Sequence, residues 1–154
     1  MSVKRTVSRQ YARFADNAAE TAGGLSRPPE GWIASMRKAL GMSARQVAQR
    51  AGITKAAVYQ AERKELKGGI TVRQLEKLAG AMEARLVYAI VPAGGSVRGQ
   101  LLRRARQKAE RIVRRAGSHM ALEQQGLPEP LIGEQIDDLA WEFAREPKPE
   151  LWDD

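Results

Sequence analysis

The chain has 154 residues, of which 43 % are apolar and 29 % are charged, with no cysteine and one histidine. The missing cysteines exclude disulfides and Cys-based metal sites, and a single histidine cannot build a zinc site, so we expect no metal or other cofactor. No apolar run approaches the ~20 residues of a membrane span, and the first residues lack the apolar core of a secretory signal. We therefore expect a cytoplasmic protein with no membrane partner.

The net charge of +8 is unevenly distributed along the chain. Residues 1–122 contain 24 Lys and Arg against 8 Asp and Glu, whereas residues 123–154 contain 2 against 10. A basic body favours a polyanionic partner such as nucleic acid. The acidic end would face a basic partner, shield the body or simply be solvated.

Residues 1–26 predict a basic N-terminal arm or helix. Val7, Tyr11, Phe14 and Ala18 recur at the spacing of one helix face, which is typical of a short amphipathic helix. The prolines and glycines of "TAGGLSRPPEG" then interrupt the helix and make a linker or a rigid entry into the next segment.

Residues 27–92 predict a helical domain that ends in a strand. Four short helices are expected between residues 31 and 82, with a loop at "KELKGGI", residues 64–70. The apolar positions that we expect to form the core of this domain are Trp32, Ile33, Val47, Ile53, Val58 and Leu75.

Residues 43–64 have the pattern of two capped helices joined by a tight turn. Ser43 precedes Gln46 by three residues, as in a capping box, and Thr54 caps the second helix. Gly52 lies between them and allows the positive φ that the turn needs. This is the pattern of a helix-turn-helix, in which the second helix enters the major groove of DNA.

Residues 84–91, "ARLVYAIV", break the helical rhythm. They are β-branched and apolar, and Pro92 follows them, so we expect a short strand. A lone strand leaves its backbone groups unpaired, and no second strand stands out in the sequence. We therefore expect this strand to pair with the same strand of a second copy, through Leu86, Tyr88 and Ile90. The alternative is a buried extension of the preceding helix.

Residues 93–154 predict a basic long helix, an acidic C-terminal helix and a tail. The long helix, residues 97–123, is expected to bury a stripe made of Val97, Leu101, Ala105, Ile112, Ala116 and Met120. Its many arginines would lie along DNA phosphates, or the stripe would pack on the last helix with the arginines solvated or paired with the acidic end. The two interpretations are compatible, with the stripe facing inward and the arginines outward. That last helix is expected over residues 130–145, followed by a loose tail.

The helix-turn-helix stretch resembles the phage-repressor-like family that is often called the XRE family. The positions that match the family pattern are Ser43, Val47, Ala48, Gly52, Ile53, Thr54, Val58, Glu62 and Arg63. The resemblance covers about residues 32–82, and it implies a five-helix-type core in a mainly α protein that binds DNA. Ala44 departs from the pattern, because the family often has a DNA-contacting glutamine there.

The same resemblance implies which residues touch DNA. Base edges would be read by Thr54, Lys55, Ala56, Tyr59 and Gln60. Lys55 would donate to guanine and Gln60 would pair with adenine, whereas Tyr59 would contact a thymine methyl or a phosphate, or serve packing alone. Phosphates would be bound by Ser43, Arg45, Arg63 and Lys64. Glu62 is expected to be a structural partner of an amide or an arginine.

Over about residues 27–150 the chain resembles the family called mobile mystery protein A, through "RPPEGWIASMRKALGMSARQVAQRAGIT" and "ITVRQLEKLAGAMEARLVYAIVP". That family is found on mobile elements and is paired with mobile mystery protein B, which has a Fic domain. Fic domains commonly transfer AMP from ATP to a hydroxyl group. "SRPPEG" also fits, read literally, the helical motif by which some Fic antitoxins block ATP, but its two prolines oppose a helix.

Together these features predict a transcriptional regulator that binds a near-palindromic operator as a homodimer and is associated with the nucleoid. The resemblance adds repression of an operon that also encodes a Fic-domain protein. The alternative is a protein-binding antitoxin that docks on that partner through Ile136, Leu139, Trp141 and Phe143. We do not expect an enzyme, because no carboxylate pair with a nucleophile, no Ser–His pair and no phosphate loop stand out.

Overall fold

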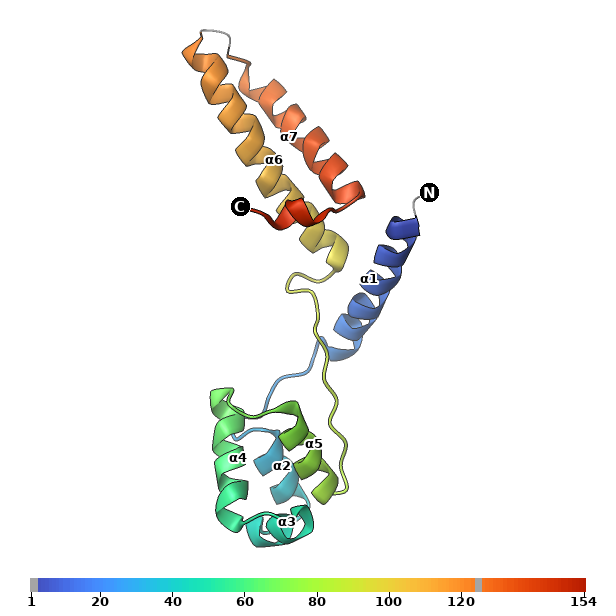
Figure 1. Ribbon diagram of the computed structural model, residues 1–154, viewed down its shortest axis with the longest axis vertical. Helices are drawn as coiled ribbons and strands as arrows, with labels where there is room; N and C mark the ends of the chain where they lie inside the picture. Colours follow the sequence, from blue (N-terminus) through green and yellow to red (C-terminus); the bar gives the residue numbers. More distant parts are fainter. Residues whose placement is uncertain (1–2, 124–125) are drawn as a thin grey trace. The chain divides into compact units, whose positions relative to one another are not determined.

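The computed structural model describes residues 3–123 and 126–154, and within them the chain is helical (Figure 1). It has seven α-helices and one short 3-10 helix in this part, which confirms the mainly α class. The chain divides into two compact units, one made of Gly24–Tyr88 and the other of Met1–Gly23 with Ala89–Asp154. None of the helices described is both long enough and apolar enough to cross a lipid bilayer.

The unit Gly24–Tyr88 contains the four short helices expected from the sequence. They are α2 (Trp32–Ala39), α3 (Ala44–Ala51), α4 (Lys55–Lys67) and α5 (Val72–Ala81). The prediction of a loop over residues 64–70 is wrong in its first half, because α4 continues to Lys67 and ends where Gly68 takes a φ of 79°.

Apolar side chains from all four helices form the core of this unit. Val47 and Val58 are completely buried, and Ile33 and Leu78 are nearly so, while Ile53 and Leu75 pack against them from the edge. The prediction for Trp32 is wrong, because this residue is 47 % exposed. Its ring lies at the helix start and lines a shallow apolar groove on the surface of the unit, together with residues of α5 and of the following segment.

Residues 84–91 are extended but form no strand, so the predicted β-strand is wrong for the single chain. The alternative helical extension is also wrong, because α5 ends at Ala81 and Glu83 takes a positive φ of 56°. A strand is defined by its ladder partner, and nothing in residues 3–123 or 126–154 pairs with this segment. Tyr88 and Ile90 are consequently 72 % and 91 % exposed.

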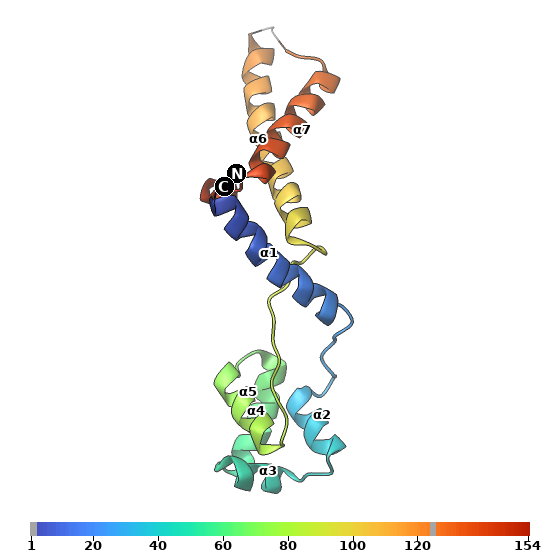
Figure 2. The ribbon, with the colours of Figure 1, turned by 90° about the vertical axis from the view of Figure 1, so that its right-hand side faces the viewer.

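The second unit contains α1 (Val3–Ala22), α6 (Val97–Leu122) and α7 (Glu129–Arg145), which confirms the three helices predicted outside the helix-turn-helix region. Helices α6 and α7 lie side by side and run in opposite directions in both views (Figures 1 and 2). Their shared core consists of Ala105, Ala109, Ile136, Ala140 and Leu151. The small alanines allow the two helix backbones to approach closely.

The predicted apolar stripe of α6 is only partly correct. Ala105 is completely buried and Leu101 packs against the core, as expected. Ile112 and Ala116 are exposed, because α7 covers a different row of α6 residues. That row continues from Ala105 in steps of four, through Ala109 and Val113.

The C-terminal tail is bound to α6, and the prediction that it is loose is wrong. Residues Pro149–Trp152 form a 3-10 helix that places Leu151 in the core, where it is 4 % exposed. The Arg104 guanidinium donates from Nε to the Leu151 carbonyl and from Nη2 to the Trp152 carbonyl, each at 3.0 Å. It also hydrogen-bonds the Asp154 carboxylate at 3.0 Å, and this bond lowers the pKa of Asp154. Lys108 donates to the Glu150 carbonyl.

Acidic groups of the C-terminal region form ion pairs with several basic residues of α6. Arg106 pairs with Asp137, Arg114 with Glu129, and Arg111 with Asp154. This favours the second of the two interpretations of α6, in which its arginines pair with the acidic end. Net charge is accordingly concentrated elsewhere: residues 24–88 contain 12 Lys and Arg against 5 Asp and Glu, and so carry +7 of the total of +8.

We expect Leu151→Ala to destabilise the unit formed by α1, α6 and α7 by about 2–5 kcal/mol, because it removes a buried side chain from the core of the hairpin. The free energy of unfolding from urea denaturation of the full chain would measure this effect. Leu122→Ala, at the end of α6, is the matched control, since Leu122 is 83 % exposed. Equal losses for the two variants would contradict the role assigned to Leu151.

Candidate nucleic-acid interface

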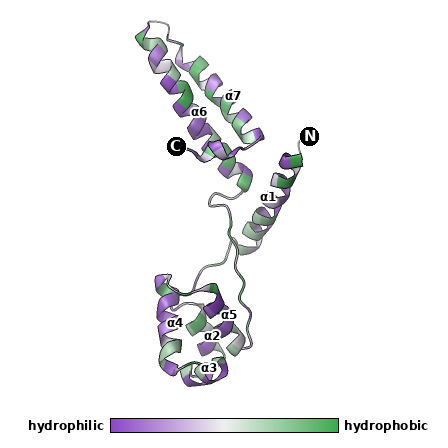
Figure 3. Cartoon of the chain, in the orientation of Figure 1, coloured by the Kyte–Doolittle hydropathy of each residue, from purple (hydrophilic) through white to green (hydrophobic). Residues whose placement is uncertain are grey.

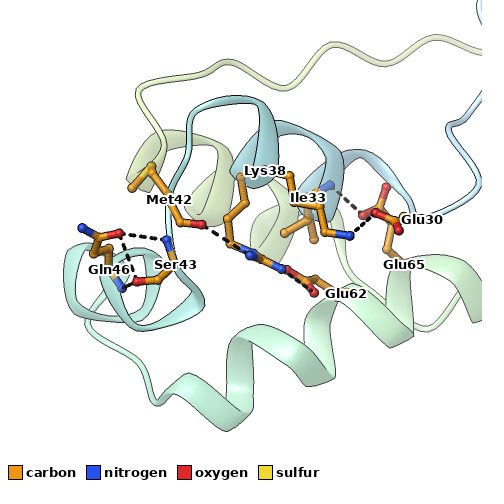
Figure 4. Close-up of polar contacts among 9 residues, drawn as sticks. Glu30, Ile33, Lys38, Met42, Ser43, Gln46, Glu62 and Glu65 are labelled. Atoms are coloured by element: carbon orange, nitrogen blue, oxygen red, sulfur yellow. Dashed lines mark hydrogen bonds and ion pairs between the residues drawn. The ribbon is translucent and has the colours of Figure 1, made fainter.

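Helices α3 and α4 each begin at a side-chain cap. Ser43 caps α3: its hydroxyl accepts from the Gln46 amide at 3.2 Å, and its own amide donates to the Gln46 side chain at 2.8 Å. The two residues therefore form the capping box predicted from the sequence, and both are drawn in Figure 4. Thr54 caps α4 by accepting from the Ala57 amide at 3.1 Å, also as predicted.

Gly52 ends α3 in the left-handed conformation, with φ of 67° and ψ of 34°. The Ile53 amide then donates to the Ala48 carbonyl at 3.0 Å, which closes the end of α3. A side chain at position 52 would strain this backbone, so glycine is required by the turn rather than by contacts. Helix α4 can consequently begin at Lys55, with only three residues between it and the end of α3 at Ala51.

Helix α4 is attached to α2 by an ion pair that is largely shielded from solvent. The Arg37 guanidinium donates to both oxygens of the Glu62 carboxylate, at 2.7 and 3.3 Å, and also to the Met42 carbonyl at 3.3 Å. The hydrogen bond to Glu62 raises the pKa of Arg37. The expectation that Glu62 is a structural partner is therefore confirmed.

Glu65 makes a second attachment, which the sequence did not reveal. Its carboxylate accepts from the Trp32 amide at 2.6 Å and from the Ile33 amide at 3.0 Å, so it caps α2 in place of the missing side-chain cap at Gly31. Figure 4 shows Glu62 and Glu65 reaching toward α2 from the same face of α4. A Cβ at position 31 would lie 2.8 Å from the Glu65 carboxylate, so only glycine leaves room for this cap.

We expect Glu65→Ala to lower the free energy of unfolding by about 1–3 kcal/mol, because two amides at the start of α2 lose their acceptor. Glu76→Ala on α5 is the matched control, since Glu76 is exposed. Urea denaturation of both variants would measure the difference, and equal stabilities would show that the cap contributes nothing.

The opposite face of α4 is open to solvent and contains the residues expected to read bases. Thr54, Lys55, Ala56, Tyr59 and Gln60 are all exposed. From Lys55 on, they follow one another at the spacing of a single helix face, while Val58, Ala61 and Glu65 of the same helix are buried. The structure therefore brings all five together at the start of α4.

Tyr59 lies between two cations. The Arg37 guanidinium and the Lys55 ammonium are each 5.9 Å from its ring centroid, and its side chain remains 39 % exposed. Both alternatives for this residue, a packing role and a DNA contact, are compatible with this position.

The residues expected to bind phosphates are exposed as well. Ser43 lies at the start of α3, and Arg45 follows in its first turn, where the backbone amides of a helix favour an anion. Arg63 and Lys64 lie further along α4. Among the residues that the structure describes, no carboxylate forms an ion pair with Arg45, Arg63 or Lys64, in contrast to Arg106, Arg111 and Arg114 of α6.

Ala44 is only 2 % exposed and belongs to the core. The position at which the XRE family often has a DNA-contacting glutamine is therefore occupied here by a packing residue. The neighbouring Gln46 does not replace it, because the Gln46 side chain is bonded to Ser43. Ser43 and Arg45 are the exposed residues at the start of α3 that were expected to bind phosphates.

The comparison with known families agrees with this geometry. Residues 33–88 match the family model HTH_3, which describes a helix-turn-helix, and this range contains nearly all of α2 and the whole of α3, α4 and α5. No curated protein and no solved structure matches the chain. The chain therefore contains an XRE-type, DNA-binding helix-turn-helix domain at residues 33–88.

Proposed function

We propose that this chain is a sequence-specific transcriptional regulator, and not an enzyme, that binds a near-palindromic operator as a homodimer. The observation that carries the proposal is the two-sided use of α4. Its inner face is bonded to α2 through Glu62 and Glu65, and its outer face presents exposed polar side chains. A helix held in this way suits insertion into the major groove.

Base recognition is assigned to the first turns of α4. Lys55 donates to the O6 and N7 acceptors of guanine, and Gln60 forms a bidentate pair with adenine. Thr54 and Ala56 lie beside them at the entry of the helix into the groove, and Tyr59 contacts a thymine methyl or a phosphate. The exposure of these side chains supports the assignment.

Affinity without sequence information is assigned to Ser43, Arg45, Arg63 and Lys64. The net charge of +7 on residues 24–88 supports this, because the basic residues there are not cancelled by the acidic end. Each phosphate that is neutralised steepens the dependence of log affinity on log salt by about 0.9. Operator binding is therefore expected to weaken strongly with salt.

The homodimer is proposed because two half-sites about one DNA turn apart require two recognition helices. The extended residues 84–91 support it, since their backbone groups are unpaired and Tyr88 and Ile90 are exposed. Leu86, Tyr88 and Ile90 would lie on one side of the segment when it pairs with a second copy. The strand would then exist only in the dimer.

Repression of its own operon, shared with a Fic-domain protein, is the finer form of the proposal, and the resemblance to mobile mystery protein A supports it. The rival role, neutralising that protein by direct binding, is less well supported. Three of the four α7 residues expected to anchor it, Ile136, Leu139 and Phe143, pack in the core shared with α6. Trp141 alone of the four is exposed, at 60 %.

We expect Lys55→Ala combined with Gln60→Ala to abolish the preference for DNA from upstream of the chain's own gene over shuffled DNA, while binding to shuffled DNA persists. Fluorescence anisotropy at several salt concentrations would measure both affinities. Arg73→Ala combined with Lys77→Ala, on the exposed surface of α5, is the matched control. An unchanged preference in the first variant would refute the recognition-helix assignment.

We expect Tyr88→Asp combined with Ile90→Asp to shift the dimer toward monomers, because charged side chains oppose pairing of the extended segments. Light scattering coupled to size-exclusion chromatography would measure the mass. Arg85→Asp controls for added negative charge within the same segment, because Arg85 is exposed and would lie on the opposite side of a strand from Tyr88 and Ile90. A dimer that withstands the double substitution would remove residues 84–91 from the interface.

A further inference from the structure

Helices α1, α6 and α7 border a cleft of about 250 Å³ within the second unit. Hydrophilic residues recur along all three helices in Figure 3, so charged side chains reach even the places where these helices meet. Four arginines line the cleft: Arg5 and Arg9 of α1, Arg98 of α6 and Arg145 of α7. We name it the arginine cleft. The acidic residue in its lining is Glu146, so four positive charges face one negative charge.

The four arginines of the cleft lack counter-charges. Arg104 and Arg106, further along α6, each form an ion pair with a carboxylate. Within residues 3–123 and 126–154, no carboxylate, that of Glu146 included, forms an ion pair with any of the four cleft arginines. Like charges that converge without a counter-charge repel one another, and an anion bound among them would remove this repulsion.

Arg5 supplies a second, independent observation. Its Nε is buried and has no hydrogen-bond acceptor in the part of the chain that the structure describes. A buried donor without an acceptor is uncommon and costly in a folded protein. Because a guanidinium donates from Nε and Nη as a planar fork, the missing acceptor is best supplied by an anion with two oxygens to offer.

The cleft is also partly preorganised. The Arg145 guanidinium lies 5.3 Å from the ring centroid of Trp141, which lines the cleft as well. This cation–π contact restricts the Arg145 side chain before any ligand arrives. Less conformational freedom is then lost when the guanidinium binds an anion.

We propose that the arginine cleft binds the phosphate group of a small ligand. A phosphate group carries about −1.5 to −2 charges at pH 7 and has several acceptor oxygens, so it offsets the charge of the cleft better than one carboxylate would. The volume of the cleft lies just below the ~300–1,000 Å³ of pockets for drug-sized molecules, which fits a compact ligand.

The buried donor favours a small ligand over the backbone of DNA. Each phosphate of a duplex is fixed in a stiff polymer, which does not follow the walls of a narrow cleft. A free phosphate ester enters the cleft and reaches the Arg5 guanidinium. This inference goes beyond the proposed function, because it concerns α1, α6 and α7 and requires neither operator recognition by α4 nor a dimer.

Isothermal titration calorimetry of the full chain with inorganic phosphate, without DNA and at constant ionic strength, would test the proposal. Arg9→Gln combined with Arg98→Gln removes two cations of the cleft. Arg13→Gln combined with Arg115→Gln is the matched control, because it removes the same charge from exposed positions of the same two helices outside the cleft. We expect the dissociation constant for phosphate to rise by about tenfold or more in the first variant and to stay about unchanged in the control.

Two calorimetric results would overturn the proposal. Absence of phosphate binding by the unsubstituted chain would remove the site itself. Equal weakening in the two double variants would show that only overall charge attracts the anion. Neither result bears on the preference of α4 for operator DNA, so failure here is distinguishable from failure of the proposed function.

Binding of shuffled DNA, measured by fluorescence anisotropy, separates a small ligand from the DNA backbone. We expect the two double variants to bind shuffled DNA equally well. A selective loss of DNA affinity in the Arg9 and Arg98 variant would assign the cleft to the DNA backbone and would overturn the small-ligand proposal.

A single substitution covers the case in which the double variant folds poorly. Arg145→Gln removes the preorganised guanidinium, and Lys148→Gln is its control, an exposed cation three positions further on and outside the cleft. We expect weaker phosphate binding for Arg145→Gln alone, with the helix content by circular dichroism unchanged in both. Equal phosphate affinities would contradict the proposed site.

Discussion

The attachment of α4 to α2 through two carboxylates determines which face of α4 the helix-turn-helix domain exposes to solvent. Glu62 and Glu65 lie three positions apart on α4, so they share one face. One binds the Arg37 side chain and the other binds the first amides of α2. These polar contacts orient α4 about its own axis, which apolar packing of Val58 and Ala61 alone would specify less sharply, because hydrogen bonds are directional.

A second set of polar contacts joins basic residues of α6 to acidic residues of α7 and of the C-terminal tail. The acidic α7 and the tail neutralise α6 locally, so the long basic helix is not a free polycation despite its eight arginine and lysine residues between Arg98 and Arg115. Net positive charge is concentrated in residues 24–88, the unit that contains α4, with +7 of the total of +8. Such an asymmetry favours an encounter with DNA through that unit, and its effect diminishes over the Debye length of about 10 Å at 0.1 M salt.

Features that depend on local sequence were predicted well, and features that depend on distant residues were not. The caps at Ser43, Thr54 and Gly52 and the ends of α6 and α7 were predicted because each is written within a few neighbouring positions. Glu65 was missed, since its partners lie more than 30 residues away. The attachment of the tail to α6 was missed for the same reason. The strand expected at residues 84–91 was wrong because a strand needs a second segment to pair with, and the described part of one copy offers none.

The separation of the two faces of α4 has a consequence for how the domain can change. Substitutions at Lys55, Ala56 and Gln60 alter groups that contact neither the buried core nor the two carboxylate attachments. Their effect on folding is expected to be small, since surface positions of this kind usually change stability by less than about 0.5 kcal/mol. Under the proposed base-reading role of α4, new operator preferences would be accessible by point mutation without prior stabilisation of the domain, and the outer face of α4 would be the position for a selection library.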